Sequence, residues 1–243
     1  MKEKLLEITS LSKHFGGNAA VSNVSFDVEE EMILGLIGPN GSGKTTLFNC
    51  ITGYYPLSSG SVRFIGRDIT GMKPDKACRL GMVRTWQRVK PLGSLSVLEN
   101  VMIGAFAKTR SPVRSRNIAL ERLEMLGMGG LGPKAAGKLP IGLKKKLELA
   151  RALATGPKLL LLDEICGGLN YSETQELLET IRGIRENGTA IVFIEHDMKA
   201  VTGLCDRIVV LKSGEKLAEG LPSEITSNPA VIAAYLGAGY GHA

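Results

Sequence analysis

The chain has 243 residues, of which 44% are hydrophobic, 22% are charged and 5% are aromatic, and its formal net charge is +6. This length allows one large domain with a sizeable core, or a domain with an inserted lobe. The basic residues are scattered, which argues against a nucleic-acid surface, and the four cysteines lie far apart, which argues against a disulfide framework. The chain shows no apolar signal segment and no apolar run long enough to span a membrane, so we predict a cytoplasmic protein.

Short strands separated by turns are predicted at the start of the chain. Residues 5–11 and 21–28 carry strand patterns, and the apolar run at 32–37 is typical of a buried strand. The helix that follows is expected to include Lys44 and to end at Gly53, because glycine suits the left-handed turn beyond a helix end.

A phosphate-binding pattern, G-x-x-x-x-G-K-[ST], lies between this strand and this helix. It consists of Gly38, Pro39, Asn40, Gly41, Ser42, Gly43, Lys44 and Thr45, and Thr46 follows it. Glycines let the backbone turn with several N–H groups pointing inward, and the helix start adds a positive dipole end. We therefore predict a nucleoside triphosphate here, with Lys44 on the β- and γ-phosphates and the Thr45 hydroxyl on Mg²⁺. The alternative is a glycine-rich turn with a chance lysine.

The middle of the chain changes from strand to helix patterns. Residues 60–66 predict a hairpin and residues 81–87 a strand, whereas 89–155 carry no evident strand. Helical spacing occurs at 97–107, 115–126 and 143–155. We expect an inserted helical lobe, with the lysine run at 144–146 on a solvated helix surface because consecutive helical positions point in different directions.

Strands and helices alternate in the remaining third of the chain. The predicted elements are strands at 159–162 and 189–194, an amphipathic helix at 173–185, two edge strands at 207–212 and 214–218 around a Ser213-Gly214 turn, and a short polar helix at 229–236. Such alternation predicts an α/β fold with a mostly parallel sheet.

Two adjacent carboxylates, Asp163 and Glu164, end the strand at 159–162. Asp163 would lie at the carboxyl edge of the sheet near Mg²⁺, and Glu164 is the natural base for an attacking water. The alternative, a core strand followed by an acidic helix cap, is less compatible with the phosphate loop upstream. Cys166, two residues further on, is expected to be a small buried thiol whose modification would inhibit turnover.

Further motifs follow in a consistent order along the chain. They are Arg84-Thr85-Trp86-Gln87, Leu98-Glu99-Asn100-Val101, Gly168-Leu169-Asn170 and Glu195-His196-Asp197-Met198. Together with the phosphate loop and the Asp163-Glu164 pair, they resemble the nucleotide-binding subunit of ABC transporters over essentially the whole chain. Within that family the chain is most similar to the ATPases of branched-chain amino acid importers.

The resemblance implies a P-loop NTPase core with a mostly parallel sheet, an N-terminal antiparallel β subdomain and an inserted α-helical subdomain. It implies one ABC ATPase domain over 1–243, with the core and β subdomain at 1–88 and 156–220, the helical subdomain at 89–155 and a C-terminal helical tail at 221–243. By the same resemblance, Phe15 would stack on adenine, Gln87 would sense the γ-phosphate and Mg²⁺, and His196 would hold the γ-phosphate and the attacking water. The alternative roles are packing for Phe15, a polar surface position for Gln87 and a structural role for His196.

The family's signature motif, L-S-G-G-Q, is altered here. Its positions are Leu139, Pro140, Ile141, Gly142 and Leu143. In the family this motif contacts the γ-phosphate bound to a partner subunit. The serine and the glutamine are missing, but the Gly142 backbone N–H and the helix N-terminus could still face an anion.

The resemblance also implies a function and its partners. Two subunits, identical or different, would sandwich two ATP molecules with Mg²⁺, grip a membrane permease on the inner face of the membrane, and power uptake of branched-chain or other hydrophobic amino acids supplied by a solute-binding protein. No nucleic-acid partner is expected. Two alternatives remain: an ATP-binding, weakly hydrolysing half of an asymmetric pair, and a soluble ABC ATPase that acts on nucleic acid or ribosomes.

Overall fold

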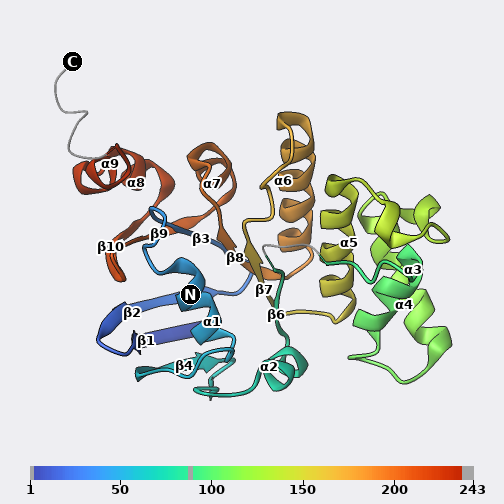
Figure 1. Cartoon of the computed structure of the whole chain (residues 1–243), viewed down its shortest axis with the longest axis horizontal. Coiled ribbons are helices and arrows are strands. Elements are labelled where there is room, and N and C mark those ends of the chain that lie inside the picture. The colour runs from blue at the N-terminus through green and yellow to red at the C-terminus, as the bar shows by residue number, and fades with distance from the viewer. Residues whose placement is uncertain (1–2, 87–89, 237–243) are drawn as a thin grey trace.

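Two β-sheets form the centre of the structure, a computed structural model that describes residues 3–86 and 90–236 (Figure 1). The first sheet is antiparallel, with strand order β2-β1-β4-β5. Its strands are β1 (Lys4–Phe15), β2 (Asn18–Glu29), β4 (Ser59–Phe64) and β5 (Arg67–Asp68). It confirms the predicted N-terminal antiparallel subdomain, although β1 and β2 are longer than the predicted strands.

The second sheet is mostly parallel, with strand order β10-β9-β3-β8-β7-β6. Its strands are β3 (Ile33–Ile37), β6 (Met82–Arg84), β7 (Leu159–Asp163), β8 (Ala190–Ile194), β9 (Arg207–Lys212) and β10 (Glu215–Gly220), of which only β10 runs antiparallel to its neighbour. Leu36 and Asp163 both pair with Ile194, so β3, β7 and β8 end together at one edge. The segments that follow these three strands carry the predicted site.

Apolar side chains bury both faces of this second sheet. In β3, for example, Leu34 and Leu36 face the antiparallel sheet and α1 (Lys44–Ile51), whereas Ile33 and Ile37 face the cluster formed with helices on the other side. Strands covered on both faces need near-continuous apolar runs, which explains why these segments do not alternate with polar residues.

Helices cover the far face of the sheet and form the inserted lobe. Figure 1 shows α3, α4 and α5 gathered at one end of the molecule, with α6 between them and α7. These helices are α3 (Val97–Ala105), α4 (Pro112–Met125), α5 (Ile141–Ala154), α6 (Tyr171–Glu186) and α7 (Met198–Leu204). Ser96–Glu99 and Asn170–Glu173 capping boxes fix the starts of α3 and α6. Within the described residues, no helix is both long and apolar enough to cross a membrane.

Several predicted elements need correction. β9 is not an edge strand, because it pairs with β3 as well as with β10, and its run of buried residues at 208–211 suits an interior position. The hairpin predicted at 60–66 is present, since β4 and β5 pair antiparallel around a turn at 65–66, but its second strand begins beyond the predicted range. Two helices were not predicted, α2 (Pro74–Leu80) and α7, whereas α8 (Pro222–Ser227) lies within the expected C-terminal helical tail.

Two predictions about polar surfaces were also wrong. The last helix, α9 (Pro229–Leu236), is apolar rather than polar, and its Val231 is buried. Within the lysine run, Lys144 and Lys146 are partly exposed, but Lys145 is only 4% exposed and points into the protein. Gln87 lies outside the described residues, so its predicted role rests on the sequence alone.

Candidate functional site

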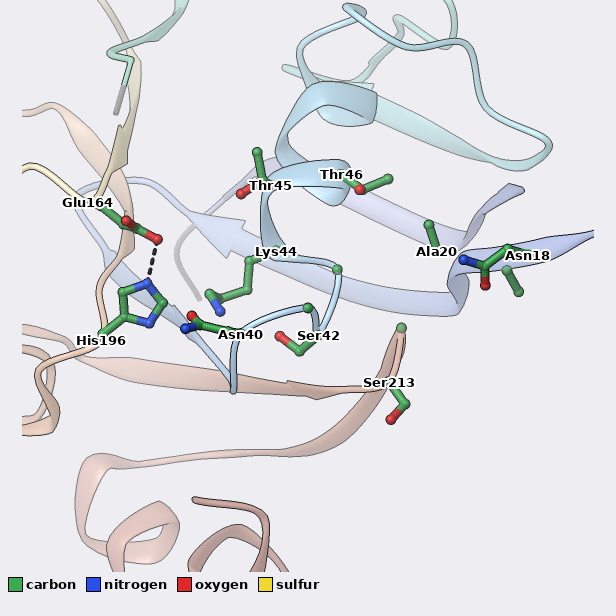
Figure 2. Close-up of a pocket in the computed structure, with 14 residues that line it drawn as sticks. Asn18, Ala20, Asn40, Ser42, Lys44, Thr45, Thr46, Glu164, His196 and Ser213 are labelled. Atoms are coloured by element: carbon green, nitrogen blue, oxygen red, sulfur yellow. Dashed lines mark hydrogen bonds and ion pairs between the residues drawn. The ribbon is translucent and has the colours of Figure 1, made fainter. Parts of the chain in front are cut away.

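A cavity of about 460 Å³ opens at the edge where β3, β7 and β8 end (Figure 2). Its lining residues come from five separate parts of the chain. They are Asn18, Ala19, Ala20, Asn40, Gly41, Ser42, Gly43, Lys44, Thr45, Thr46, Glu164, His196, Ser213 and Gly214. The structure therefore brings the predicted phosphate loop, base and switch histidine to one place.

The phosphate loop depends on glycine at its close contacts. Gly38 has φ of 154°, and a Cβ there would lie 2.2 Å from the Leu211 carbonyl oxygen. Gly43 has φ of 100°, and a Cβ there would lie 2.6 Å from the Ala20 carbonyl oxygen. Both positions combine a backbone conformation that favours glycine with a close approach of other backbone atoms.

We expect Gly38→Ala to lower the free energy of unfolding by about 3 kcal/mol, because it adds a backbone clash to an unfavourable φ. Gly41→Ala is the matched control: its φ is 79°, but open space surrounds the position, so we expect a loss of about 1 kcal/mol. Denaturant unfolding of both variants measures the difference. Equal losses would show that the contact with Leu211 does not constrain the loop.

Lys44 lies under the loop and is 5% exposed. Its Nζ donates hydrogen bonds to the carbonyl oxygens of Gly38, at 2.6 Å, and Pro39, at 3.0 Å. Burial lowers the pKa of Lys44, and the carboxylates of Glu164 and Asp163 oppose that shift. A buried cation whose acceptors are neutral carbonyl groups is well suited to a phosphate oxygen, which accepts stronger, charge-assisted hydrogen bonds.

Glu164 and His196 meet at the rim of the cavity, where Figure 2 shows their side chains pointing toward each other and toward Lys44. His196 Nε2 lies 2.5 Å from Glu164 Oε1. Glu164 has φ of 49°, and its backbone N–H donates to the Ile194 carbonyl at 3.0 Å. This arrangement places a carboxylate and an imidazole in direct contact beside a phosphate loop, as general-base chemistry on a water requires.

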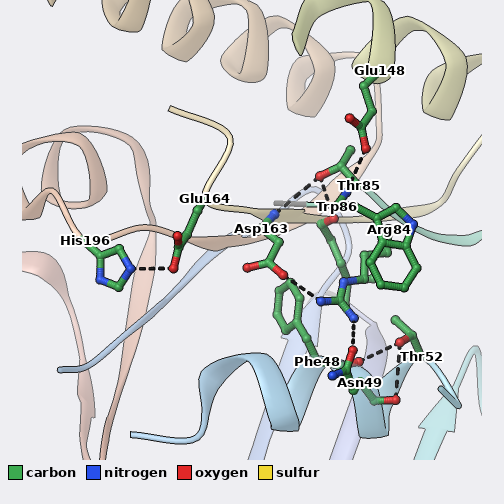
Figure 3. A network of polar contacts seen from close by, with 11 residues as sticks. Phe48, Asn49, Thr52, Arg84, Thr85, Trp86, Glu148, Asp163, Glu164 and His196 are labelled. Carbon is green, nitrogen blue, oxygen red and sulfur yellow. Dashed lines mark hydrogen bonds and ion pairs between the residues drawn. The ribbon is translucent and has the colours of Figure 1, made fainter. Parts of the chain in front are cut away.

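Asp163 is 2% exposed and belongs to a second polar network (Figure 3). Its Oδ2 lies 2.6 Å from Arg84 Nη2, and Arg84 Nη1 donates to Asn49 Oδ1 at 2.5 Å. The Arg84 guanidinium also lies over the rings of Trp86, at 4.7 Å from the centroid, and Phe48, at 5.4 Å. Arg84 thus fixes one oxygen of Asp163, and Figure 3 shows the other pointing away from the guanidinium.

The chemistry of these side chains fits Mg²⁺ better than a transition metal. In the part of the chain that the structure describes, no group of three or more His, Cys, Asp or Glu side chains could hold a metal ion. Mg²⁺ in nucleotide sites needs only one or two protein oxygens, because phosphates and waters complete its shell. Asp163 and Thr45, which together line a second cavity of about 330 Å³ next to the first, offer a carboxylate and a hydroxyl.

The structure does not bring all predicted site residues to the main cavity. Phe15, although described, lies outside its lining and packs edge-on against Tyr55, with ring centroids 5.4 Å apart. The altered signature borders a different cavity, of about 140 Å³, whose lining includes Pro140, Gly142 and Leu143. Within one chain, the signature and the phosphate loop therefore belong to separate surfaces.

The residues that close the cavity opposite Glu164 were not predicted from the sequence. Asn18 and Ala20 come from β2, and the turn at 213–214 comes from between β9 and β10. Gly214 N–H donates to the Ser42 carbonyl at 3.0 Å, and Ser22 N–H donates to the Gly214 carbonyl at 2.8 Å. The turn was predicted, but its contact with the phosphate loop arises only because β9 lies beside β3.

Comparison with protein families gives two matches. The ABC transporter family matches residues 21–167, and the family described as branched-chain amino acid ATP-binding cassette transporter matches residues 215–241. Together they cover the phosphate loop, the Asp163-Glu164 pair and the end of the chain.

Similar proteins and structures extend over the full length. The high-affinity branched-chain amino acid transport ATP-binding protein LivG of Salmonella typhimurium is 42% identical, over 98% of this chain and 99% of that protein. The corresponding BraF protein of Pseudomonas aeruginosa is 40% identical, with the same coverage. A crystal structure of an ATP-binding cassette of an ABC transporter in its ADP conformation is 32% identical, with a TM-score of 0.89 over 97% of this chain and 99% of that one.

Proposed function

Because the chain belongs to the ABC transporter family, as an ATP-binding protein of the branched-chain amino acid transport type, we propose that it hydrolyses ATP at the main cavity to power uptake of branched-chain or other hydrophobic amino acids. The observation that carries this proposal is the 2.5 Å contact between Glu164 and His196 beside Lys44. A carboxylate, an imidazole and a buried ammonium around a phosphate loop are the groups that phosphoryl transfer to water needs.

Each group has a role in this proposal. Lys44 and the backbone N–H groups at 40–46 stabilise the charge that spreads over the γ-phosphoryl oxygens. Glu164 accepts a proton from the attacking water, and His196 holds that water and the γ-phosphate in place. Phe15 would serve the adenine only if its ring turns from Tyr55 toward the nucleotide.

Mg²⁺ would be held by Thr45 and Asp163, with Gln87 near it. When bound, it supplies positive charge to the β- and γ-phosphate oxygens. Arg84 supports this site because its ion pair keeps Asp163 in one orientation at the end of β7. The buried carboxylate therefore presents its second oxygen without rearrangement.

We further propose that two copies complete each other's sites. The signature residues at 139–143 lie on a surface separate from the phosphate loop, so they are available to a second subunit. In this arrangement, residues 1–88 and 156–220 form the nucleotide-binding core, 89–155 the helical subdomain and 221–243 a C-terminal tail. An asymmetric pair with a different ATPase subunit, in which this chain hydrolyses weakly, is the second candidate because the signature lacks its serine and glutamine.

The partners follow from the same assignment. The chain would sit on the cytoplasmic face of the membrane, held there by permease subunits, and a solute-binding protein would deliver the amino acid to the permease. The transport ATPases among its relatives favour this function over action on nucleic acid or ribosomes.

Replacement of His196 tests the site directly. His196→Ala is expected to lower kcat for ATP hydrolysis by about a hundredfold, within the range for loss of an acid–base group, while ATP affinity changes little. His14→Ala, on the exposed part of β1, is the control and should keep normal turnover. Steady-state ATPase assays measure both, and equal activity of the two variants would rule out the role assigned to His196.

A further inference from the structure

We propose that Lys145 and Glu195, two buried charged residues outside the cavity, are positioning residues that fix the backbone after Glu164 and hold its carboxylate against His196. We call this pair the Lys145–Glu195 clamp. The inference rests on the proposed role of Glu164 as the base, and it explains why one lysine of the run at 144–146 points inward.

Lys145 reaches this backbone from α5, in the helical lobe. Its Nζ donates to the Ile165 carbonyl oxygen at 2.5 Å and also donates to the Gly167 carbonyl oxygen. One ammonium thus joins two carbonyl groups of the turn that begins at Glu164. The side chain crosses from one subdomain to another, since the acceptors follow β7 in the nucleotide-binding core.

Glu195 reaches the same turn from the opposite element. It follows β8 directly, is 5% exposed, and accepts a hydrogen bond from the Cys166 backbone N–H at 2.7 Å. His196 is the next residue along the chain. Glu195 therefore ties the segment after the proposed base to the residue that contacts this base.

The two charges compensate each other in a buried setting. Burial lowers the pKa of Lys145 and raises that of Glu195, and the attraction between the two opposes both shifts. Removing Lys145 would take away the cation that compensates the buried Glu195 carboxylate, and removing Glu195 would take away the leading one of the carboxylates that compensate Lys145, ahead of Glu148 and Glu164. Loss of a partner from a buried ion pair is strongly destabilising. A lysine on a solvated helix surface would not need a buried partner charge.

The backbone at Glu164 needs this support. A φ of 49° is rarely adopted by a residue other than glycine, and such a conformation persists only where surrounding contacts fix it. The clamp supplies contacts at the next three residues: the carbonyls of Ile165 and Gly167 and the amide of Cys166. Because α5 begins at Ile141, the clamp also connects the altered signature to the base through about one helical turn.

Cys166 provides a built-in reporter of this turn. Cys166 is 9% exposed, in agreement with the buried position expected from the sequence, and burial raises the pKa of its thiol. Alkylation of a buried thiol requires local opening, so its rate reports how firmly the turn is held. Lys145 lowers the pKa of this thiol and Glu195 raises it, so faster labelling in Lys145→Met, where the pKa effect alone would slow the reaction, is the decisive sign of opening. Cys205, which is 7% exposed and lies before β9, reports general unfolding in the same molecule.

The test uses Lys145→Met, Glu195→Gln, the conservative Lys145→Arg and the control Lys144→Met in the full chain. N-ethylmaleimide labelling followed by peptide mass spectrometry gives both thiol rates. We expect Cys166 labelling to rise about tenfold or more in Lys145→Met and Glu195→Gln at an unchanged Cys205 rate. We expect kcat to fall on the order of tenfold to hundredfold, with nucleotide Kd within about twofold. Lys145→Arg should keep the Cys166 labelling rate and kcat close to those of the parent protein, and Lys144→Met should have the same labelling rate and kcat as the parent.

Other results would overturn the inference. One is a Cys166 labelling rate that stays unchanged in Lys145→Met and Glu195→Gln. The other is an equal rise in the labelling rates of Cys166 and Cys205 in these two variants, which would indicate general destabilisation. The thiol rates do not depend on the assigned chemistry. If Glu164→Gln kept normal turnover, the proposed base would be wrong, while labelling would still decide whether the clamp holds the turn.

Discussion

Replacement of Glu164 with glutamine is expected to leave ATP binding intact and to slow ATP hydrolysis by on the order of a hundredfold to ten-thousandfold, the range for loss of a general base. The amide keeps the size of the carboxylate and can still contact His196, but it cannot accept a proton from water. Binding should persist because Lys44 and the loop amides, which hold the phosphates in this account, are untouched.

The appropriate measurements are nucleotide affinity by equilibrium binding and single-turnover hydrolysis with Mg-ATP. Glu186→Gln, at the exposed end of α6, removes a carboxylate of the same kind far along the chain and serves as the control. Turnover of Glu164→Gln within about threefold of the control would be incompatible with a base at this position, since even weak acid–base groups contribute more.

Lys44→Ala is expected to affect binding as well as chemistry. Its ammonium is buried and makes two hydrogen bonds within the loop, so the group is already directed to where a phosphate would lie. A hydrogen bond from a charged group contributes roughly 1.5–3 kcal/mol, which corresponds to a loss of ATP affinity of about tenfold to hundredfold. Hydrolysis should fall further, because the charge on the γ-phosphoryl oxygens grows in the transition state.

Calorimetric titration with ATP measures the loss of affinity, and Lys212→Ala, which removes an exposed lysine at the end of β9, is its control. Circular dichroism of the Lys44 variant should show a folded protein, with some loss of stability because the Gly38 and Pro39 carbonyls lose their donor. An ATP affinity equal to that of the control would place the phosphates elsewhere on the protein.

Local signals in the sequence identified most of the site. The phosphate loop is contiguous, and close backbone contacts require glycine at two of its positions, Gly38 and Gly43. Asp163 and Glu164 were predicted from their place at the end of a buried strand, and His196 from the family resemblance together with its place after another buried strand. The parallel sheet brings these strand ends together. The mostly parallel sheet and the helical lobe were likewise predicted from local signals, namely the spacing of apolar residues along the chain.

Contacts between distant segments could not be predicted in this way. The turn at 213–214 meets Ser42 only because β9 is an interior strand, and Lys145 is buried only because the turn after β7 provides carbonyl acceptors. No periodic pattern in α5 distinguishes Lys145 from its neighbours. The missed helix α2 is different, since Pro74 at its first position was an available signal.

The central claim is that two copies of this chain close around ATP, with the signature at 139–143 of each copy completing the phosphate loop of the other. Its most direct test is the solution mass of the Glu164→Gln variant by light scattering after size exclusion, with and without Mg-ATP. We expect the mass of one chain without nucleotide and of two chains with it, because the blocked hydrolysis step should hold the closed state. A variant that binds ATP and keeps the mass of a single chain would contradict it.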